Sequence, residues 1–506
     1  MSKLFHGLLI AVLVGTFALL STSCSEVDNQ DAPGIKNLQF DIKVLYESGL
    51  DTKVVQTKWE DGNKVYAFFW LDDPEGMLDP ASYVTLTFDA TANKWNGALS
   101  GNLTDADVLG ESGEMFAIFF PFGDVAVIPD GNGGVNFRTS NTAHPGLSGM
   151  PVYSYYMTAR AYYTVETVGD VATLDATLKM KLPDNFVYFF VDKDGDNYYE
   201  NDKYRLAVEG VYPVACTSFK NGFHETPQNG KYIGQPMWGY QYGNEFGKGI
   251  AFSGKIDNTW GASTPHRFIF FSDGDPAVAK TFSESLPSHY SVKLKAPVAG
   301  NGWEPALTAP TTTLVKGKKW ANWNLGADDV NGLGFYLRWG GLVEPKDHNA
   351  DALLMERHIT GDLTGDRVYF DAARAYLGSS WRMPTSSEMA SLGSVTSSSW
   401  IPVGNTEISV GPTVESGIYY YPSPSLKNGG WRVVDGSNSI FLPVTGMYQN
   451  TKSLKESWDT YSVGCYYTST GVGKYLRFYN GSTTFTTTTS SSYIEWGMPV
   501  RPIKID

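Results

Sequence analysis

Histidine, cysteine and serine are the side chains of this sequence that could act as bases, nucleophiles or metal ligands. None of the histidines after residue 24 stands in a His-Glu-x-x-His pattern, the helical spacing that holds zinc in metalloproteases. The sequence also has no Cys-x-x-Cys pair and no Gly-x-Ser-x-Gly elbow. Cys216 and Cys465 stand far apart, and we expect both to be buried thiols. We therefore predict that the protein is not an enzyme and needs no cofactor.

Four aspartates in one short stretch could offer the hard oxygen ligands that calcium prefers. They are Asp192, Asp194, Asp196 and Asp202. Glycine falls at the fourth position of this stretch instead of the sixth, and Lys203 stands where a bidentate glutamate would close a calcium loop. We favour a turn in a hairpin between strands at 186–191 and 204–211, and keep calcium binding as the alternative.

Aromatic residues in or beside the loops of the C-terminal region could form a binding surface without calcium. Exposed aromatic rings stack on sugar faces or anchor protein interfaces. The alternative is that these rings belong to the core or cover it. The candidates are Tyr420, Trp431, Tyr448, Trp458 and Tyr461.

Composition excludes several classes of function. The chain has 506 residues, with 39 Lys and Arg against 53 Asp and Glu, so its formal net charge is -14. An acidic surface argues against nucleic acid, since phosphate binding needs cationic side chains to replace counterions. Charged residues make up only 18% and aromatic residues 14% of the chain, which excludes a disordered protein. The 53 glycines with so many aromatics favour β-rich domains with many turns.

The N-terminus reads as a signal and an anchor. A mostly apolar run at 7–20 is too short to span a membrane, and it is followed by Ser-Thr-Ser and Cys24. Small residues before a lone cysteine resemble a bacterial lipobox, although Ser21 stands where an aliphatic residue is usual. The resemblance implies cleavage before Cys24 and fatty acylation of its thiol, including palmitate, which would hold the protein in the outer membrane. Plain secretion is the alternative.

Residues 24–33 form a polar, acidic tether that resembles the surface-export signal of Bacteroidota lipoproteins. No later stretch is apolar for 18 residues, so we predict no transmembrane helix.

Short alternating segments separated by Gly, Asn, Asp and Pro predict two tandem β-sandwiches. In 37–46 every second residue is apolar, and 65–70 and 115–120 read as buried strands. The Asn-Lys-Trp-Asn-Gly segment at 93–97 reads as a turn. The predicted divisions are a signal peptide at 1–23, a tether at 24–33, β-sandwiches at 34–160 and 161–300, a linker at 301–313 and an α+β domain at 314–506.

The C-terminal region has a different sequence pattern, which predicts two helices beside a sheet. Residues 367–377 place apolar side chains on one helical face. Residues 385–392 begin with Thr385 as N-cap and carry Glu388 three residues later, the pattern of a capping box.

The first two regions resemble the fimbrillin family, the β-sandwich pilins of Bacteroidota surface fimbriae. The resemblance is carried by the order of short elements, namely Trp59-Glu-Asp-Gly-Asn-Lys-Val65, Phe88-Asp-Ala90, Trp95-Asn-Gly97 and Phe116-Ala-Ile-Phe-Phe-Pro121. Asn63 stands where the family usually has Asp, and one extra residue precedes Pro121. The resemblance covers about 34–300 and implies surface fimbriae as the location.

The third region resembles the Fibrobacter major paralogous (FISUMP-type) domain, whose fold is similar to C-type lectins or to the formylglycine-generating enzyme. Its blocks are Trp320-Ala-Asn-Trp-Asn-Leu-Gly-Ala327, Gly334-Phe-Tyr-Leu-Arg-Trp-Gly340, Gly378-Ser-Ser-Trp-Arg-Met-Pro-Thr385, Ile440-Phe-Leu-Pro-Val-Thr-Gly446, Gly464-Cys-Tyr-Tyr-Thr-Ser-Thr470 and Gly497-Met-Pro-Val-Arg-Pro502. Tyr467 stands where Trp is usual. Arg382 in the third block and Glu388 just after it are candidates for a structural ion pair.

Fimbrillins, by this resemblance, assemble by strand exchange after an N-terminal strand is removed, here the strand around 40–44. Family cleavage often follows Arg, but the first Arg is Arg138, so cleavage would need Lys36, Lys43 or Lys53. The C-terminus is taken up by an extra domain instead of a strand to donate. Both facts favour a tip or accessory subunit that adheres to a surface glycan or protein through its C-terminal domain. The alternatives are an uncleaved fimbrial anchor subunit and a glycan-capture lipoprotein of a nutrient-uptake system.

Overall fold

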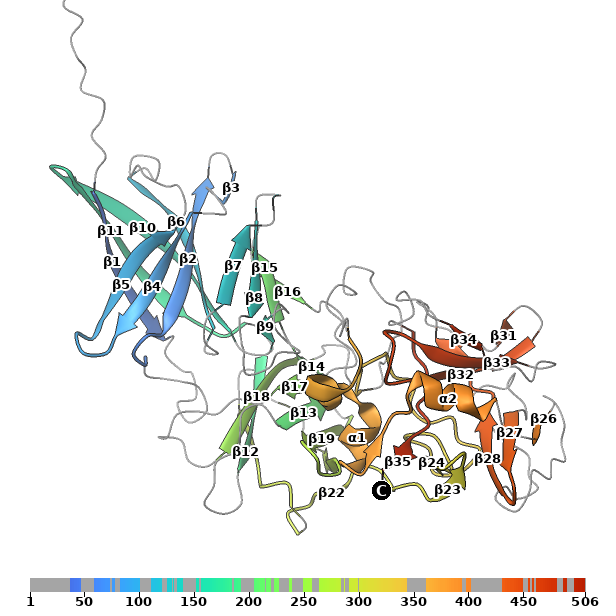
Figure 1. Cartoon of the computed structure of the whole chain (residues 1–506). Coiled ribbons are helices and arrows are strands. Elements are labelled where there is room, and N and C mark those ends of the chain that lie inside the picture. The colour runs from blue at the N-terminus through green and yellow to red at the C-terminus, as the bar shows by residue number, and fades with distance from the viewer. Residues whose placement is uncertain are drawn as a thin grey trace, which may run out of the picture.

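A computed structural model shows a chain built from several β-sheets, with a few short helices in its C-terminal part (Figure 1). This confirms the predicted class, mainly β with an α+β C-terminal region. No helix among the described residues is long and apolar enough to cross a membrane. The structure describes residues 37–46, 59–72, 75–77, 82–100, 111–120, 125–129, 131, 134–139, 152–153, 156–183, 186–192, 204–213, 215–219, 223–226, 236–238, 249–256, 264–283, 286, 291–298, 300–343, 361–393, 397–401, 430–448, 454–455, 457–458, 461–479, 486–488 and 496–505.

The first sheet has eight strands in the order β1-β11-β10-β6-β2-β4-β5, with β3 paired to β2. Alternating apolar residues build it, because successive side chains of a strand face opposite sides. In β4 the buried residues are Val84, Leu86 and Phe88, and the residues between them are only half-buried. The strands are β1 (Asn37–Tyr46), β2 (Lys64–Asp72), β3 (Glu75–Met77), β4 (Tyr83–Asp89), β5 (Lys94–Ser100), β6 (Ser112–Phe119), β10 (Met157–Val168) and β11 (Val171–Met180).

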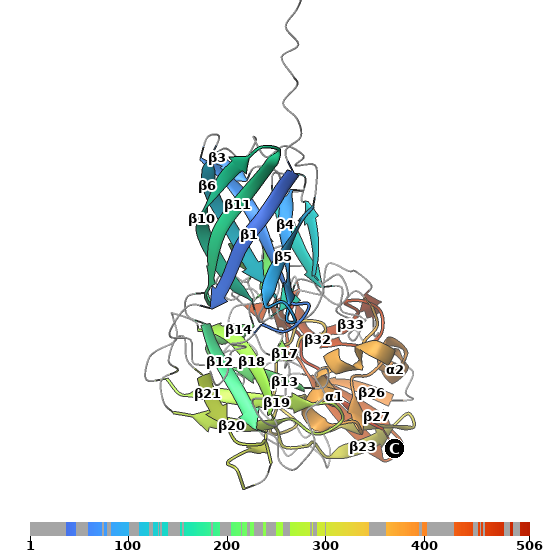
Figure 2. The same ribbon diagram turned by 90° about the vertical axis from the view of Figure 1, so that its left-hand side faces the viewer.

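The first sheet curls until its two end strands meet. Strands β1 and β5 stand at opposite ends of the strand order, yet Cα atoms of the two come within 8 Å, and Figure 2 shows them side by side. β1 runs parallel to β11, while every other pairing on the path is antiparallel. No ladder joins β1 to β5 among the described strands. The sheet therefore encloses its own core and leaves one open line, the β1–β5 seam.

The second sheet has nine strands in the order β21-β12-β18-β14-β13-β19-β20-β22, with β17 paired to β13. The predicted hairpin between 186–191 and 204–211 is wrong, because β18 and β14 lie between the two strands. Both segments are strands, but their partners come from elsewhere in the chain. The strands are β12 (Phe186–Asp192), β13 (Tyr204–Val208), β14 (Val211–Pro213), β17 (Met237–Trp238), β18 (Gly249–Ile256), β19 (His266–Ser272), β20 (Val278–Phe282), β21 (Ser291–Leu294) and β22 (Glu304–Pro305).

Strand β12 belongs to two cores at once. Phe186, Tyr188 and Phe190 pack into the core of the first sheet. Their neighbours Val187, Phe189 and Val191 pack into the core of the second sheet. A strand covered on both faces needs apolar residues throughout, which explains the unbroken run Phe-Val-Tyr-Phe-Phe-Val. The two N-terminal units are therefore joined by a shared strand.

Several predicted boundaries shift in the structure. The division at 160/161 falls inside β10, and β11 belongs to the first sheet as the partner of β1. A five-stranded sheet, β16-β15-β8-β7 with β9, combines segments from both predicted sandwiches. The predicted linker contains β22 and the start of β23, and Trp303 is buried in the second core. The strands of the mixed sheet are β7 (Val125–Pro129), β8 (Val135–Thr139), β9 (Val152–Tyr153), β15 (Ala215–Phe219) and β16 (Phe223–Thr226).

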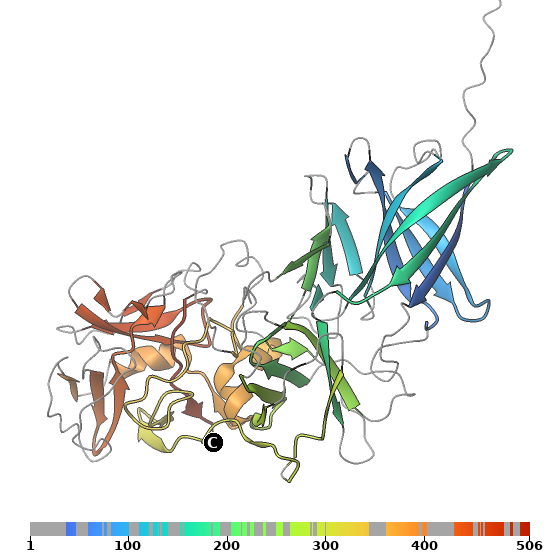
Figure 3. The same cartoon turned by 180° about the vertical axis from the view of Figure 1, so that it is seen from behind.

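The C-terminal part contains small antiparallel sheets, and its four-stranded sheet has the order β23-β24-β35-β25. Figure 3, which views the molecule from behind, shows these sheets at the end of the molecule opposite β1 and β5. The strands are β23 (Thr312–Val315), β24 (Lys318–Ala321), β25 (Trp381–Arg382), β26 (Ser397–Ile401), β27 (Gly430–Asp435), β28 (Asn438–Pro443), β29 (Met447–Tyr448), β30 (Leu454–Lys455), β31 (Ser457–Trp458), β32 (Tyr461–Tyr467), β33 (Tyr475–Tyr479), β34 (Thr486–Thr488) and β35 (Ile503–Lys504).

The two predicted helices are present with modified starts. The first splits into a 3-10 turn, η5 (Gly365–Phe370), and α1 (Ala372–Leu377), because extended Asp371 ends one and caps the other. The second is α2 (Ser386–Leu392), and its capping box is confirmed. The Thr385 hydroxyl accepts from Glu388 N, and the Glu388 carboxylate accepts from Thr385 N.

Helix α1 packs against the second sheet. The rings of Phe271 and Tyr376 meet edge to face with centroids 5.1 Å apart, and one apolar cluster contains residues of both parts. The turn after β19 adds polar contacts, since Ser379 N donates to Gly274 O at 2.8 Å and Ala277 N donates to Tyr376 O at 3.1 Å. The C-terminal part therefore packs directly against the second sheet and is not joined to it by a linker alone.

Candidate functional site

Most predicted site residues lie outside the part of the chain that the structure describes. These are the lipidation residue Cys24, the processing candidates Lys36 and Lys53, the calcium candidates Asp194, Asp196 and Asp202, and the aromatic candidate Tyr420. The fourth calcium candidate, Asp192, ends β12 and is half-buried. The described residues contain no group of three or more His, Cys, Asp or Glu that could hold a metal ion.

The aromatic candidates of the C-terminal part differ in position. Trp431 is a correction, because it is 1% exposed and lies in the core under α2, where no ligand can stack on it. Tyr448 is half-buried and meets Tyr336 edge to face at 5.0 Å. Trp458 and Tyr461 stand directly opposite each other in the hairpin of β31 and β32.

Cys465 lies in β32 and is fully buried. Burial raises the pKa of its thiol, with Arg477 opposing the rise only in part. A thiol held protonated at neutral pH is a poor nucleophile. The residue therefore packs in the core, as the sequence predicts.

Lys43 is the processing candidate that lies among the residues the structure describes. It lies in β1. Its side chain is exposed, and its Cα partner in the parallel ladder is Thr177 of β11. Ile42 and Val44 on either side of Lys43 are buried in the first core. β1 is thus bound by a ladder on one edge and by the core on one face. Its second edge faces the β1–β5 seam.

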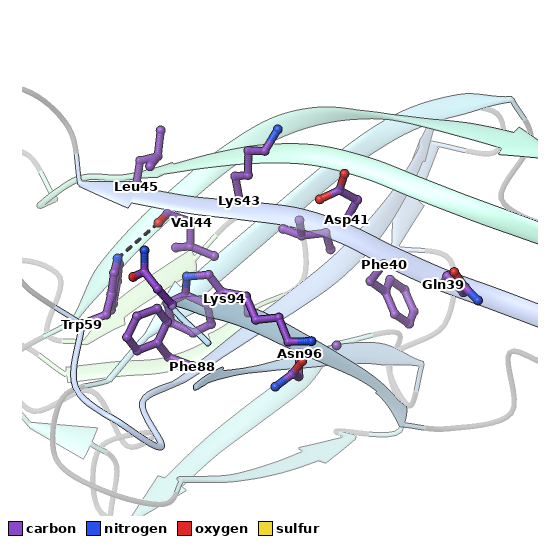
Figure 4. A pocket seen from close by; sticks show the side chains of 14 residues that line it. Gln39, Phe40, Asp41, Lys43, Val44, Leu45, Trp59, Phe88, Lys94 and Asn96 are labelled. Carbon is purple, nitrogen blue, oxygen red and sulfur yellow. Dashed lines mark hydrogen bonds between the residues drawn. The ribbon is translucent and has the colours of Figure 1, made fainter. Parts of the chain in front are cut away.

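Trp59 closes one end of the seam. Its indole N–H donates to Val44 O at 3.2 Å, so a side chain supplies the donor that a neighbouring strand would otherwise supply (Figure 4). The ring packs edge to face against Trp95 of β5 at 4.8 Å and against Phe119 of β6 at 5.0 Å. Trp59 therefore bridges from β1 to β5 and to the core.

The turn that carries Trp59 explains its sequence motif. Gly62 has a positive φ of 82°, which glycine adopts without steric cost. The Asn63 side-chain oxygen accepts from Glu60 N at 2.9 Å. An aspartate could accept the same hydrogen bond, so either residue suits this turn.

Phe40 closes the other end of the seam by lying across Gly97 of β5. A Cβ atom placed on Gly97 would come within 2.7 Å of the Phe40 ring and 2.8 Å of its Cβ. The segment 93–97, predicted as a turn, is therefore largely strand, and its glycine is needed for close packing instead of for a bend. Between Trp59 and Phe40 the seam forms a groove of about 830 Å³.

The C-terminal blocks are scaffold. Arg382 donates to both Glu388 oxygens, at 2.7 and 2.6 Å, so the candidate ion pair is present and bidentate. Burial opposes ionisation of Glu388, but the hydrogen bonds from Arg382 and Thr385 outweigh it and lower the pKa of the carboxyl to about 2. Asp371 behaves oppositely, because burial raises its pKa to about 6 against hydrogen bonds from Arg374 N and Met383 N.

The last strand is held on both sides. β35 lies between β24 and β25 in its sheet, with Ile503 opposite both Trp320 and Arg382. Just before it, fully buried Arg501 donates to Ala321 O at 3.0 Å and to Phe441 O at 2.9 Å. Releasing β35 would therefore break two ladders and expose a buried cation.

Sequence reasoning missed Arg205, which is buried where α1 meets the second sheet. Its segment Tyr-Arg-Leu-Ala-Val reads as an ordinary strand, and no signal in the sequence marks its partner. It also missed Trp59 as the residue that holds β1, although the Trp-Glu-Asp-Gly motif drew attention to it.

Comparison with known proteins gives remote likenesses only. No family model and no curated protein matches the chain. Among solved structures, a Bacteroides fragilis protein provisionally described as a cell adhesion protein has a TM-score of 0.26 at 8% identity, over 51% of this chain and 92% of its own. A fimbrial protein from Bacteroides ovatus has a TM-score of 0.24 at 10% identity, over 94% of this chain and 99% of its own.

The fimbrial anchor protein Mfa2 from Porphyromonas gingivalis has a TM-score of 0.22 at 10% identity, over 46% of this chain and 78% of its own. Scores of this size are too low for an argument from likeness. The function of the chain is therefore argued from its own residues.

Proposed function

We propose that this chain is a surface-exposed lipoprotein of the fimbrillin type, a tip or accessory subunit of a fimbria. Cys24 would carry the lipid that directs it to the outer membrane. The first two sheets would connect it to other subunits, and the C-terminal part, 314–506, would contact a glycan or protein on the target surface. Its role would be binding and not catalysis.

The pairing of β35 on both sides is the observation that carries the proposal. A stalk subunit assembled by strand exchange must donate one strand and accept another, since β-augmentation joins neighbours through backbone hydrogen bonds. Strand β35 is locked between β24 and β25 and backed by Arg501. A subunit that accepts a strand but does not donate β35 suits the end of a fimbria or a position beside its shaft.

Strand β1 is the matching element for acceptance. It is held by one parallel ladder, and its removal would open the first core at Ile42 and Val44. A protease needs an extended, locally unfolded segment, so cleavage at Lys43 requires β1 to leave the sheet first. This favours Lys53 as the processing residue, because it follows β1 in the sequence, whereas cleavage after Lys36 would leave β1 attached.

Immunogold labelling of cells that make this chain, with mass spectrometry of their purified fimbriae, tests the proposal. We expect a small amount of the chain in the fimbriae, with gold at their free ends or sparsely along them. Gold at the cell-proximal base would indicate the anchor subunit instead. A chain that is absent from the fimbriae but abundant as free lipoprotein would overturn the proposal and favour glycan capture.

The N-terminal residue of the mature protein distinguishes the lipid-anchored, uncleaved form from the processed form. Lipid-modified Cys24 would indicate an anchored, uncleaved chain. A start after Lys43 or Lys53 would indicate that β1 has been cut from the sheet, and a start after Lys36 would indicate processing that leaves β1 in place. A Cys24→Ser variant should be lost from the outer membrane, and unchanged location would contradict lipid anchoring.

A further inference from the structure

The β1–β5 seam contains a groove while β1 is in place, and adhesion through the C-terminal part does not use it. It has a volume of about 830 Å³. Aromatic side chains from β1, β4, β5 and the turn before β2 line it, namely Phe40, Phe88, Trp95 and Trp59. The polar lining residues are Gln39, Asp41, Lys43, Asn93, Lys94 and Asn96. A groove of this size fits a ligand of a few rings.

An additional β-strand does not fit this groove. A strand inserted between β1 and β5 would need them about 9.5 Å apart, twice the usual strand spacing. The two strands come within 8 Å at their Cα atoms, and Phe40 lies on Gly97 without room for even a Cβ. With β1 in place the seam therefore accepts side-on contacts from a small or chain-like ligand, not a third backbone.

The lining suits sugar rings. The C–H face of a pyranose packs on an aromatic ring, while its hydroxyls need donors and acceptors close by. Trp59 and Trp95 are only half-buried, and Asn93 and Asn96 are exposed on the β5 side. The edges of two strands that form no ladder with each other run along the groove and add main-chain groups.

The charged residues that line the groove indicate which class of sugar it binds. Lys94 extends along the β5 side of the groove, and Asp41 and Lys43 of β1 also line it (Figure 4). Two cations, Lys43 and Lys94, and one anion, Asp41, line the groove, so its net charge is positive and complements a carboxylate.

We propose that the β1–β5 seam binds an oligosaccharide that carries a carboxylate, with its rings on Trp59 and Trp95 and its carboxylate at Lys94. The site exists only while β1 is in place, because β1 forms one wall. Ligand binding and release of β1 are then linked, and a bound sugar stabilises the closed form by mass action. This site lies on the first sheet and does not depend on the fimbrial role.

Isothermal titration of the chain from residue 25 to 506, which retains β1, with trigalacturonate and with 3′-sialyllactose tests the site. The neutral methyl ester of trigalacturonate and lactose are the matched ligands without a carboxylate. We expect at least one acidic probe to bind, and its neutral counterpart to bind about fivefold more weakly, since an exposed charge pair contributes less than about 1 kcal/mol. Raising the salt concentration should reduce that difference.

Variants locate the binding. Trp95→Ala should weaken both ligands of the bound pair about tenfold through lost stacking. Lys94→Gln and Asn96→Asp should weaken only the acidic ligand, and both positions are exposed, so neither change should affect folding. Lys179→Gln, the same charge change on the outer face of β11, is the control and should bind as the wild type does. At tenfold the dissociation constant, the ligand should slow tryptic cleavage at Lys43 about tenfold.

The proposal is overturned if neither acidic probe binds, or if binding is unchanged by Trp95→Ala, Lys94→Gln and Asn96→Asp. Equal affinity for the acid and its methyl ester would overturn recognition of the carboxylate. None of these results bears on whether the chain is found in fimbriae, so the two proposals fail separately.

Discussion

Arg205 of β13 donates a hydrogen bond to the main-chain carbonyl of Tyr369, which stands 164 residues later in the chain. Its guanidinium also lies over the ring of Phe271, 5.6 Å from the centroid, in cation–π geometry. Burial lowers the pKa of Arg205 to about 10, against the opposing charge of Asp273. A buried cation thus connects the second sheet to the segment that leads into α1.

Arg205→Lys should destabilise the protein more than Arg205→Met. A lysine keeps the charge but is more strongly hydrated and cannot lie flat on Phe271. Methionine fills similar space without burying a charge. We expect losses of about 3 kcal/mol for lysine and about 1–2 kcal/mol for methionine, as lower unfolding temperatures in calorimetry. The opposite order would show that the charge itself holds the junction.

Gly378→Ala should loosen the same junction. Gly378 has a φ of 89°, and a Cβ there would lie 3.1 Å from Gly274 O and from the Pro276 ring. Gly436 has a φ of 62° with nothing within 4 Å of its Cβ position, so Gly436→Ala reports a positive φ without a steric contact, whereas Gly378 adds both the contact and the more strained backbone of φ 89° and ψ 177°. We expect Gly378→Ala to cost about 1–2 kcal/mol more than this control in thermal unfolding. Equal losses would mean that the junction yields without cost.

Glu388→Gln should remove part of the stability that wild type has at neutral pH. The pKa of Glu388 is lowered from 4.5 to about 2, so its contribution is present above pH 4.5 and is lost as pH falls towards 2. The pKa of Asp371 is raised to about 6, so its contribution to stability changes with pH in the opposite direction. Asp371 is present in both the wild type and Glu388→Gln, so its contribution cancels in the comparison. Glutamine still serves in a capping box. The difference in unfolding free energy, about 1–3 kcal/mol at pH 7, should therefore shrink between pH 4.5 and 2. A difference independent of pH would contradict the assigned ion pair.

Local patterns predicted local structure well. The alternation of 37–46 gave β1, and Thr385 with Glu388 gave the start of α2, because both signals depend on residues a few positions apart. Strand partners were not predictable in this way. The alternation of β11 is the same whether it pairs with β10 and β1 or opens a new domain, so the boundary at 160/161 was misplaced.

Contacts between distant segments gave no local signal. The unbroken apolar run of β12 indicated a buried strand but not that its two faces serve two cores. Trp431 was grouped with loop aromatics, yet it pairs with Trp400 and Leu442 in a sheet whose inner face is buried under α2. The groove in the seam likewise depends on β1 and β5 meeting across a curled sheet, which sequence spacing does not encode.

Trp59→Phe should make β1 easier to detach from the sheet, while a ring still fills the space beside Phe119. Phenylalanine keeps a ring against Phe119 but cannot donate to Val44 O. One lost hydrogen bond should cost about 1 kcal/mol. Hydrogen exchange of the amides in β1 should become about fivefold faster, while amides of the β10–β11 hairpin serve as the internal control. Equal acceleration in both would show that Trp59 supports the sheet as a whole.

Gly97→Ala should detach β1, because the added methyl group would meet the ring and the Cβ of Phe40 at less than 3 Å. The Cβ of Phe40 is fixed to the backbone of β1, so rotation of the ring cannot remove the conflict and the strand itself must move. Ala98→Val adds more volume at the next, exposed position of β5 and is the matched control.

Tryptic release of the peptide that ends at Lys43, followed by mass spectrometry, reports how often β1 leaves the sheet. An overpacking cost of about 1–3 kcal/mol predicts cleavage roughly fivefold to a hundredfold faster in Gly97→Ala than in Ala98→Val. Equal rates in the two variants would show that the contact of Phe40 with Gly97 does not hold the strand, and that the ladder with β11 suffices.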